Sequence, residues 1–181
     1  MPNNASPGTC DWLLKATRYR YTLPVLAELE RDNGCKFVTL VRRLEASDRA
    51  IRQSLDYLLE AGWIERNPGY GHPSRPEYIL TRTARPVGLW CLGIWDELRK
   101  WSQFDVALER WPLPVLEAMG SDKARYSDLI RRFPGITARS LSFALRRLID
   151  AGLASREILP GNPPQTAYRA TPWGIAVLDV S

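Results

Sequence analysis

The sequence repeats itself at a spacing of about 90 residues, and this repeat constrains the fold more than any other feature. The segment TLPVLAEL matches PLPVLEAM, with Val25 opposite Val115, an offset of 115 − 25 = 90. KFVTLVRRL matches RYSDLIRRF at an offset of 126 − 37 = 89, and EAGWIER matches DAGLASR at 150 − 60 = 90. A near-constant offset over separated blocks in the same order indicates two copies of one small domain. A chain of 181 residues has room for both.

Each copy has a pattern of three helices. An apolar helix comes first, and a polar turn leads to a short amphipathic helix that ends in two arginines. The third helix follows a capping residue, Ser47 or Thr137, and has apolar residues at i, i+4 and i+7. Gly62 and Gly152 stand where such a helix needs a left-handed residue to end.

A β-hairpin follows each of these glycines. WIER and PEYIL are the expected strands of the first copy, and LASR and TAYRAT are those of the second. Three helices and a two-stranded hairpin make a winged helix-turn-helix. The predicted fold is therefore mainly α with small β-hairpins (α+β), as two tandem winged helix-turn-helix domains joined by a central helix. The predicted segments are a mobile N-terminal tail (1–17), a first winged domain (18–86), a connecting or dimerisation helix (87–108) and a second winged domain (109–181).

The second copy resembles the HxlR-type bacterial transcriptional regulators. RWPLPVLEAM is similar to the tryptophan-led first helix of that family, and RYSDLIRRFPGITARSLSFALRRLIDAGLASRE to its helix-turn-helix. PPQTAYRATPWG resembles its wing and the start of the next helix. The first copy matches more loosely, since Tyr21 takes the tryptophan position and EASDRAIRQS replaces the usual proline-glycine-isoleucine turn. The resemblance covers residues 18–178 and implies a DNA-binding regulator without enzymatic activity.

Relatives of this type are usually single-domain homodimers that pair through helices flanking the winged domain. The matching segment here is PVGLWCLGIWDELRKW, in which one helical stripe contains Val87, Trp90, Ile94, Leu98 and Trp101. Two alternatives stay open. The chain is either a covalent pseudo-dimer or a homodimer through this central helix.

The charge balance favours an anionic partner. The net charge is +5. Of the 25 lysines and arginines together, four are lysines, which leaves 25 − 4 = 21 arginines, and arginine suits phosphate and guanine contacts. Arginine-rich codon usage is an equally good explanation of that bias. Three scattered cysteines, no secretory signal and no apolar run long enough for a bilayer predict a cytoplasmic, nucleoid-associated protein with no membrane partner.

Double-stranded DNA is the predicted partner, and the outward faces of the third helices are the expected contact surfaces. The alternative is that these are ordinary solvated faces, but the repeated arginine at 49 and 139 favours a function. Asp48 and Asp56 would repel phosphate, so the first helix either binds more weakly or reads another half-site. Arg66 and Arg156, which the repeat also brings into correspondence, draw attention to the wings. The candidate DNA-binding residues are Ser47, Arg49, Arg52, Gln53, Arg75, Thr137, Arg139, Ser142, Phe143, Arg146 and Gln165, and the candidate phosphate contacts are Arg42, Arg43, Arg131 and Arg132.

The sequence gives no sign of catalysis, of a metal site or of a cofactor. His72 is the only histidine, and no phosphate-binding glycine loop or paired-carboxylate motif occurs. Cys10 is read as an inert thiol rather than a redox sensor. A pocket between the halves near Trp90, Trp95 and Trp101 is a weaker hypothesis, and no small-molecule effector can be identified. The alternative function is a tandem winged-helix module for protein–protein interaction, of the chromosome-organising or scaffold type.

Overall fold

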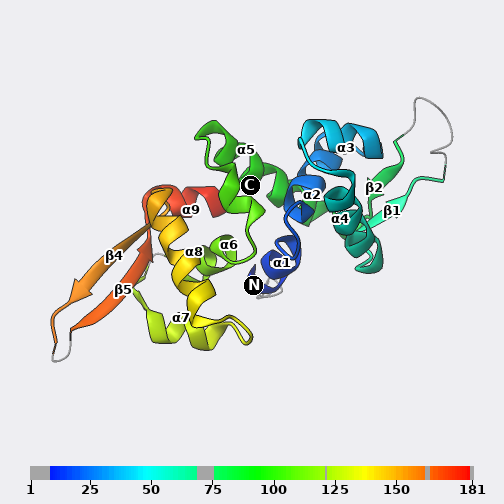
Figure 1. Ribbon diagram of the computed structural model, residues 1–181. Helices are drawn as coiled ribbons and strands as arrows, with labels where there is room; N and C mark the ends of the chain where they lie inside the picture. Colours follow the sequence, from blue (N-terminus) through cyan, green and yellow to red (C-terminus); the bar gives the residue numbers. More distant parts are fainter. Residues whose placement is uncertain (1–8, 69–75, 121, 162–163, 180–181) are drawn as a thin grey trace, which may run out of the picture. The chain divides into compact units, whose positions relative to one another are not determined.

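The computed structural model describes residues 9–68, 76–120, 122–161 and 164–179. It is mainly helical with two small antiparallel sheets (Figure 1). The described residues form two compact units: a first unit of residues 16–108, and a second unit of residues 9–15 and 109–179. In the part of the chain that is described, no helix is both long and apolar enough to cross a membrane.

The first unit contains three helices, a hairpin and a long fourth helix. The two strands are antiparallel, with Ile64 opposite Leu80. The elements are α2 (Thr22–Arg31), α3 (Phe37–Arg43), α4 (Asp48–Glu60), β1 (Ile64–Arg66), β2 (Tyr78–Leu80), α5 (Arg85–Lys100) and the short 3-10 helix η1 (Phe104–Leu108).

The core of the first unit lies where α5 packs against α2. Gly88 permits this contact, because a Cβ at that position would lie 2.4 Å from Leu80 Cδ1 and 3.1 Å from a carboxylate oxygen of Glu30. The buried face of α5 consists of Gly88, Cys91, Ile94, Trp95 and Leu98.

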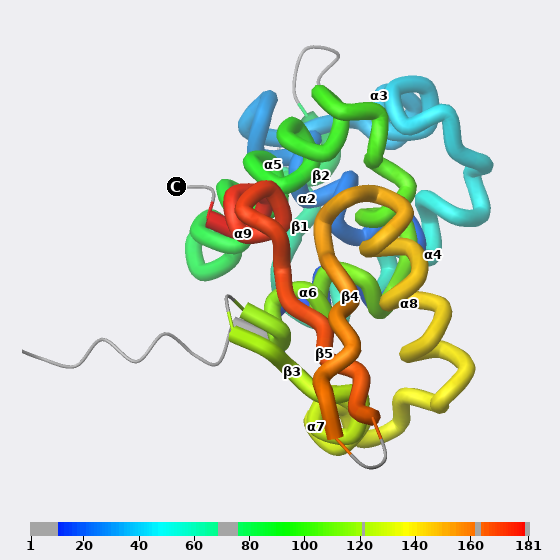
Figure 2. The backbone as a smooth tube through the Cα atoms, turned by 90° about the vertical axis from the view of Figure 1, so that its left-hand side faces the viewer, coloured from blue at the N-terminus to red at the C-terminus, as the bar shows by residue number. Residues whose placement is uncertain are grey.

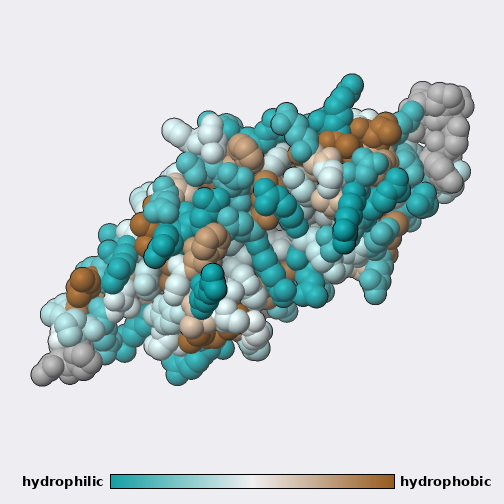
Figure 3. All heavy atoms as spheres, viewed as in Figure 1, coloured by the Kyte–Doolittle hydropathy of each residue, from teal (hydrophilic) through white to brown (hydrophobic). Residues whose placement is uncertain are grey.

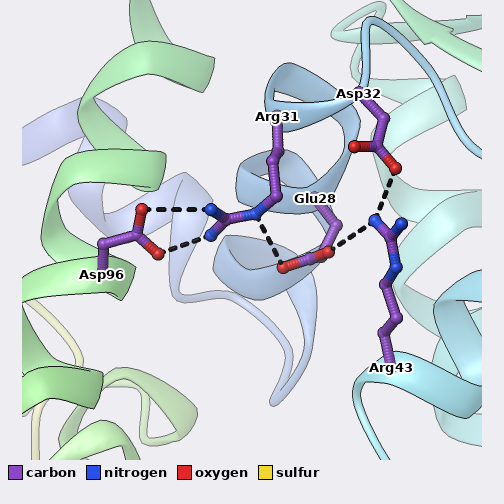
Figure 4. A network of polar contacts seen from close by, with 5 residues as sticks. All are labelled: Glu28, Arg31, Asp32, Arg43 and Asp96. Carbon is purple, nitrogen blue, oxygen red and sulfur yellow. Dashed lines mark hydrogen bonds and ion pairs between the residues drawn. The ribbon is translucent and has the colours of Figure 1, made fainter.

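Ion pairs join α2 to its neighbours in the first unit. Figure 4 shows Arg31 between Asp96 of α5 and Glu28, with an Nη1–Oδ2 distance of 3.2 Å to Asp96. Arg43, at the end of α3, contacts both Asp32 and Glu28, the latter at 3.1 Å. The Glu28 side chain is only 3% exposed, so the two guanidinium groups compensate a buried carboxylate.

From residue 109 on, the second unit has the same order of three helices, a hairpin and a final helix. Its sheet has the strand order β3-β5-β4 (Figure 2), and the β4–β5 ladder runs from Ala154 opposite Ala170 to Leu159 opposite Gln165. The elements are α1 (Thr9–Ala16, of which the part through Lys15 belongs here), α6 (Pro112–Met119), β3 (Ala124–Arg125), α7 (Tyr126–Arg132), α8 (Ala138–Asp150), β4 (Ala154–Leu159), β5 (Gln165–Ala170) and α9 (Pro172–Leu178).

Elements of the two units follow the spacing of the sequence repeat. Helices α4 and α8 begin 138 − 48 = 90 residues apart and end 150 − 60 = 90 residues apart. The predicted caps are confirmed, because Ser47 and Thr137 accept hydrogen bonds from the backbone N–H groups of Ala50 and Ser140. Gly62 and Gly152 have φ values of 67° and 72°, as predicted for helix ends. The description of these units as tandem copies stays a prediction.

Three expectations differ from the structure. The predicted tail is helical from Thr9 to Ala16, because Leu13 and Ala16 are fully buried. The predicted stripe on the central helix is rotated, since α5 buries Cys91 and Trp95 against its own unit and leaves Trp101 exposed. That helix also ends at Lys100 rather than continuing to 108.

Candidate nucleic-acid interface

Helix α8 separates an apolar face from a polar face. The buried side chains are Leu141, Ala144, Leu145 and Leu148. Arg139, Phe143 and Arg146 recur at i, i+4 and i+7 and are exposed, so they share the opposite face. Phe143 is 56% exposed, so its ring is available for a contact on this face.

Hydrogen bonds fix the start of α8 to α7. The Tyr126 hydroxyl donates to the carbonyl oxygen of Ala138 at 2.8 Å and lies 3.2 Å from Ser142 Oγ. The Thr137 hydroxyl accepts from Ser140 N–H at 3.1 Å and donates to Ser140 Oγ at 2.9 Å. Two of the predicted DNA-binding residues, Thr137 and Ser142, therefore also position the helix.

A hollow of about 390 Å³ lies between α8 and the hairpin. It is lined by Ser142, Leu145, Arg146, Ile149, Arg156 and Tyr168. Arg146 comes from α8 and Arg156 from β4, where it lies opposite Tyr168. Both arginines are exposed, and neither forms an ion pair with another described residue. Two uncompensated cations beside one hollow suit an anionic group such as a phosphate.

The hairpin presents both apolar and polar groups. Ile158 of β4 is 66% exposed. Glu157 is paired with Lys123 at 2.8 Å, and the hydrogen bond from Lys123 lowers the pKa of Glu157. Gln165 is exposed at the start of β5. Figure 3 shows a largely hydrophilic face with small hydrophobic patches, one of them over the hairpin of β4 and β5.

The arginine pair at the end of α7 is divided between two roles. Arg131 is paired with Asp128, and its Nε donates to the carbonyl oxygen of Ser127 at 3.1 Å. Arg132 is exposed and has no ion pair within the described ranges. In the first unit the order is reversed, because Arg43 binds Glu28 and Asp32 while Arg42 is exposed.

The equivalent face of α4 has a different charge. Arg49, Arg52 and Gln53 line a hollow of about 570 Å³, but Asp56 and Glu60 line it too. The Arg52 guanidinium lies 4.2 Å from the centre of the Phe37 ring. Helix α4 carries two arginines and three carboxylates (2 − 3 = −1), whereas α8 carries three arginines and one carboxylate (3 − 1 = +2).

The hairpin of the first unit is described only at its base. Arg66 pairs with Glu77 at 3.4 Å and lies over the Tyr78 ring. The predicted contact Arg75 lies outside the described residues, as do His72 and Asn162. Among the residues that are described, no cluster of acidic, histidine or cysteine side chains could hold a metal ion.

The geometry thus singles out one surface of the second unit, made of the outward face of α8 and the adjoining hairpin. Sequence reasoning named Arg139, Phe143 and Arg146, and the repeat drew attention to Arg156. The shared hollow of Arg146 and Arg156 was not predicted, because it depends on how the hairpin packs beside α8. We call Arg139, Phe143, Arg146 and Arg156 the α8 surface.

The chain is similar to known helix-turn-helix proteins. The model of the HxlR-like helix-turn-helix family matches residues 106–180. Over 71 residues the chain is 38% identical to an uncharacterized HTH-type transcriptional regulator of Methanothermobacter thermautotrophicus, covering 39% of this chain and 54% of that one. It is 31% identical over 72 residues to the putative regulatory protein MalR of Fusobacterium mortiferum, covering 39% of this chain and 68% of that one.

The chain spans about half the length of the first of these relatives. A solved structure, the putative transcriptional regulator of the MarR family from Porphyromonas gingivalis, is 32% identical with a TM-score of 0.40. The match covers 45% of this chain and 78% of that one.

Proposed function

Because the chain belongs to the HxlR-like helix-turn-helix family, we propose that it is a sequence-specific, double-stranded DNA-binding transcriptional regulator. Helix α8 enters the major groove, where Arg139 and Phe143 meet base edges. Arg146 and Arg156 hold a backbone phosphate at the hollow between helix and wing. The observation that carries this proposal is the pair of uncompensated arginines in that hollow. Such a regulator acts in the cytoplasm, on the nucleoid.

The two units act as tandem winged copies with unequal roles. The net charge of α4 is negative, and Arg43 and Arg52 are engaged within their own unit. The second unit is therefore the main DNA reader, and the first contributes less of the electrostatic affinity. Leu89 and Trp90 on α5 are exposed apolar side chains, which supports a homodimer through that helix.

A protein–protein interaction module is the second candidate. The mixed-charge hollow of α4 is the observation in its favour, because acidic groups there disfavour phosphate and suit a polar protein surface.

DNA binding by charge-reversed variants tests the proposal. Fluorescence anisotropy with fragments of the chain's own promoter region is expected to show binding that weakens steeply with salt. Arg139→Glu and Arg146→Glu should each lower affinity by about 10- to 100-fold. Lys100→Glu, an equal charge change on the exposed side of α5, is the matched control and should have a smaller effect.

Two results would overturn the proposal. One is an absence of binding at low salt to every genomic fragment tested, which leaves the interaction module as the better interpretation. The other is unchanged affinity in Arg139→Glu and Arg146→Glu proteins that remain folded. Selection and sequencing of bound genomic DNA then identifies the operator and shows whether it has one half-site or two.

A further inference from the structure

A second hollow, of about 370 Å³, adjoins α8 in the second unit. It lies between α8 and residues 109–112, where α6 begins. Its apolar wall includes Trp111, Pro112 and Phe143. Two exposed guanidinium groups, those of Arg110 and Arg139, also line it. The proposed function uses neither Arg110 nor Trp111.

The two hollows beside α8 lie on opposite flanks of its exposed face. With 3.6 residues per turn, the α8 residues that line one hollow fall on the other side of this face from those that line the second. These residues are Ser142, Leu145, Arg146 and Ile149 on the hairpin side, and Arg139, Ser140, Phe143 and Ala144 on the α6 side. Each hollow also takes an arginine from outside α8, Arg156 on the hairpin side and Arg110 on the α6 side.

The segment before α6 is fixed against α8 and α7. Arg147 of α8 donates a hydrogen bond from Nε to Glu109 Oε1 at 2.7 Å, and this pair neutralises the one carboxylate among the described residues of the lining. The Trp111 ring meets Phe133 edge to face, with ring centres 5.9 Å apart, and Phe133 is only 2% exposed. Arg110 lies over the Trp111 ring at 4.8 Å. Its guanidinium group is thus held at the hollow by a fixed aromatic surface.

This combination of groups suits a sugar–phosphate backbone. A DNA strand offers alternating phosphates and deoxyribose rings, and both are common protein contacts. The guanidinium groups of Arg110 and Arg139 match phosphate oxygens, and the apolar wall matches the carbon atoms of the sugar. The major groove is about 12 Å wide and is bounded by the phosphates of both strands, so a helix that lies in it has one strand on each flank.

The hollow on α4 has a lining that is less suited to a phosphate. Its residues Arg49 and Gln53 correspond to Arg139 and Phe143, with an offset of 90 in each case (139 − 49 and 143 − 53). Polar Gln53 thus stands where the second unit has an aromatic ring, and two carboxylates also line the α4 hollow. The first unit therefore supplies a matched control for contacts of the second.

We propose that the 370 Å³ hollow holds the backbone of the second DNA strand, with a phosphate at Arg110 and a deoxyribose against Trp111. The first strand is the one that Arg146 and Arg156 hold, so α8 is held from both sides of the groove. The inference rests on the proposed function and adds Arg110 and Trp111 to its contact surface. Charge complementarity and continuity with the α8 surface support it.

The salt dependence of DNA binding tests the role of Arg110. The probe is the genomic fragment that the wild-type chain retains most tightly, and binding is measured by fluorescence anisotropy over a salt series. Arg110→Ala should weaken binding about tenfold and reduce the slope of log affinity against log salt by about one, because one phosphate contact is lost. Arg110→Lys keeps the charge and should keep the slope.

Arg20→Ala is the matched control for Arg110→Ala. Arg20 precedes Arg110 by 110 − 20 = 90 residues, is also exposed, and lies over the ring of its neighbour Tyr21 at 5.9 Å. The same loss of charge in the first unit should change the affinity less than about twofold.

Neutral phosphates identify the strand that each arginine contacts. Methylphosphonate groups, placed one at a time in either strand of the same fragment, each remove one negative charge. Within one half-site, a substitution in one strand should weaken wild-type binding but leave Arg110→Ala almost unchanged. A substitution in the other strand should do the same for Arg156→Ala. A merely structural role of Arg110 would instead lower the affinity equally at every position.

Three outcomes overturn the inference. Equal salt slopes for wild type and Arg110→Ala exclude the phosphate contact, and coupling of Arg110 and Arg156 to the same strand excludes the arrangement across the groove. Both of these leave the proposed function intact, since Arg139→Glu and Arg146→Glu test it separately. A wild-type chain that binds no fragment at low salt overturns the proposed function and this inference together.

Discussion

The hydroxyl of Thr171 donates a hydrogen bond to the carbonyl oxygen of Gly152 at 2.8 Å. Thr81 makes the same bond to Gly62 at 3.0 Å, and both pairs are offset by 90 residues (171 − 81 and 152 − 62). The backbone N–H groups of the two threonines also donate to matching carbonyl oxygens, those of Leu153 and Trp63, at 3.0 Å each. Each hairpin therefore returns to the end of the helix that precedes it, α4 or α8, through the same contacts. This likeness supports the proposal of tandem copies.

Removing the Thr171 hydroxyl should destabilise the second unit. Thr171 Oγ1 also accepts from Gly174 N–H at 3.0 Å and so caps α9. We expect Thr171→Val to lower the free energy of unfolding by about 2 kcal/mol, because a hydrogen bond and a cap are lost together. Thr171→Ser should retain most of that stability. Urea denaturation measures the difference, and equal midpoints for the two variants would contradict it.

Gly174 allows α9 to lie directly against the backbone of Leu153. A Cβ at Gly174 would lie 2.0 Å from the Leu153 carbonyl oxygen, and a backbone atom cannot move aside as a side chain can. Gly174→Ala should cost about 3 kcal/mol of unfolding free energy. Gly135→Ala is the matched control, since its φ of 93° is strained but no atom lies within 4 Å, and it should cost about 1 kcal/mol. Thermal unfolding that ranks Gly135→Ala as the more damaging change would refute this account.

Cys91 should make stability fall in alkaline solution. Its thiol is fully buried, and burial raises its pKa far above the usual value of about 8.5. Above about pH 8.5 the unfolded chain loses this proton while the folded chain keeps it, so the free energy of unfolding decreases by up to about 1.4 kcal/mol per pH unit. Cys91→Ala should show a correspondingly shallower decline in urea titrations at pH 8–10. Parallel curves for the two proteins would rule out this role of Cys91.

Neighbouring arginines at the end of α7 should differ in their effect on DNA binding. Arg132 is exposed and has no carboxylate partner among the described residues, whereas Arg131 is paired with Asp128. If the proposed function holds, Arg132→Ala should reduce the slope of log affinity against log salt by about one. Arg131→Ala should change it less. A larger change for Arg131→Ala would place the phosphate contact on that residue instead.

The helices of the repeat were predictable because their signals are local. Ser47 and Thr137 cap α4 and α8 at the expected positions, and the left-handed Gly62 and Gly152 follow their ends. Helix α1 was missed because its few apolar residues give a short, weak pattern. The buried face of α5 was misjudged because α2 decides which side is covered.

The details of the candidate sites depend on tertiary contacts and could be predicted less well from the sequence. Nothing local in the sequence distinguishes the engaged Arg43 from the exposed Arg42. The meeting of Arg146 with Arg156 at one hollow requires the packing of the hairpin beside α8.

The net charges of α4 and α8 have opposite signs. This difference bears on how the two helices can evolve and on the orientation in which the chain binds a target. Subunits of a homodimer are products of one coding sequence and must present identical helices, so their target reads alike from either end. Helices encoded at two places in one chain can differ from each other, and α4 and α8 carry net charges of −1 and +2. Under the proposed function, a single chain that reads DNA with both helices would distinguish the two ends of its binding site, whereas a homodimer through α5 would restore the symmetry.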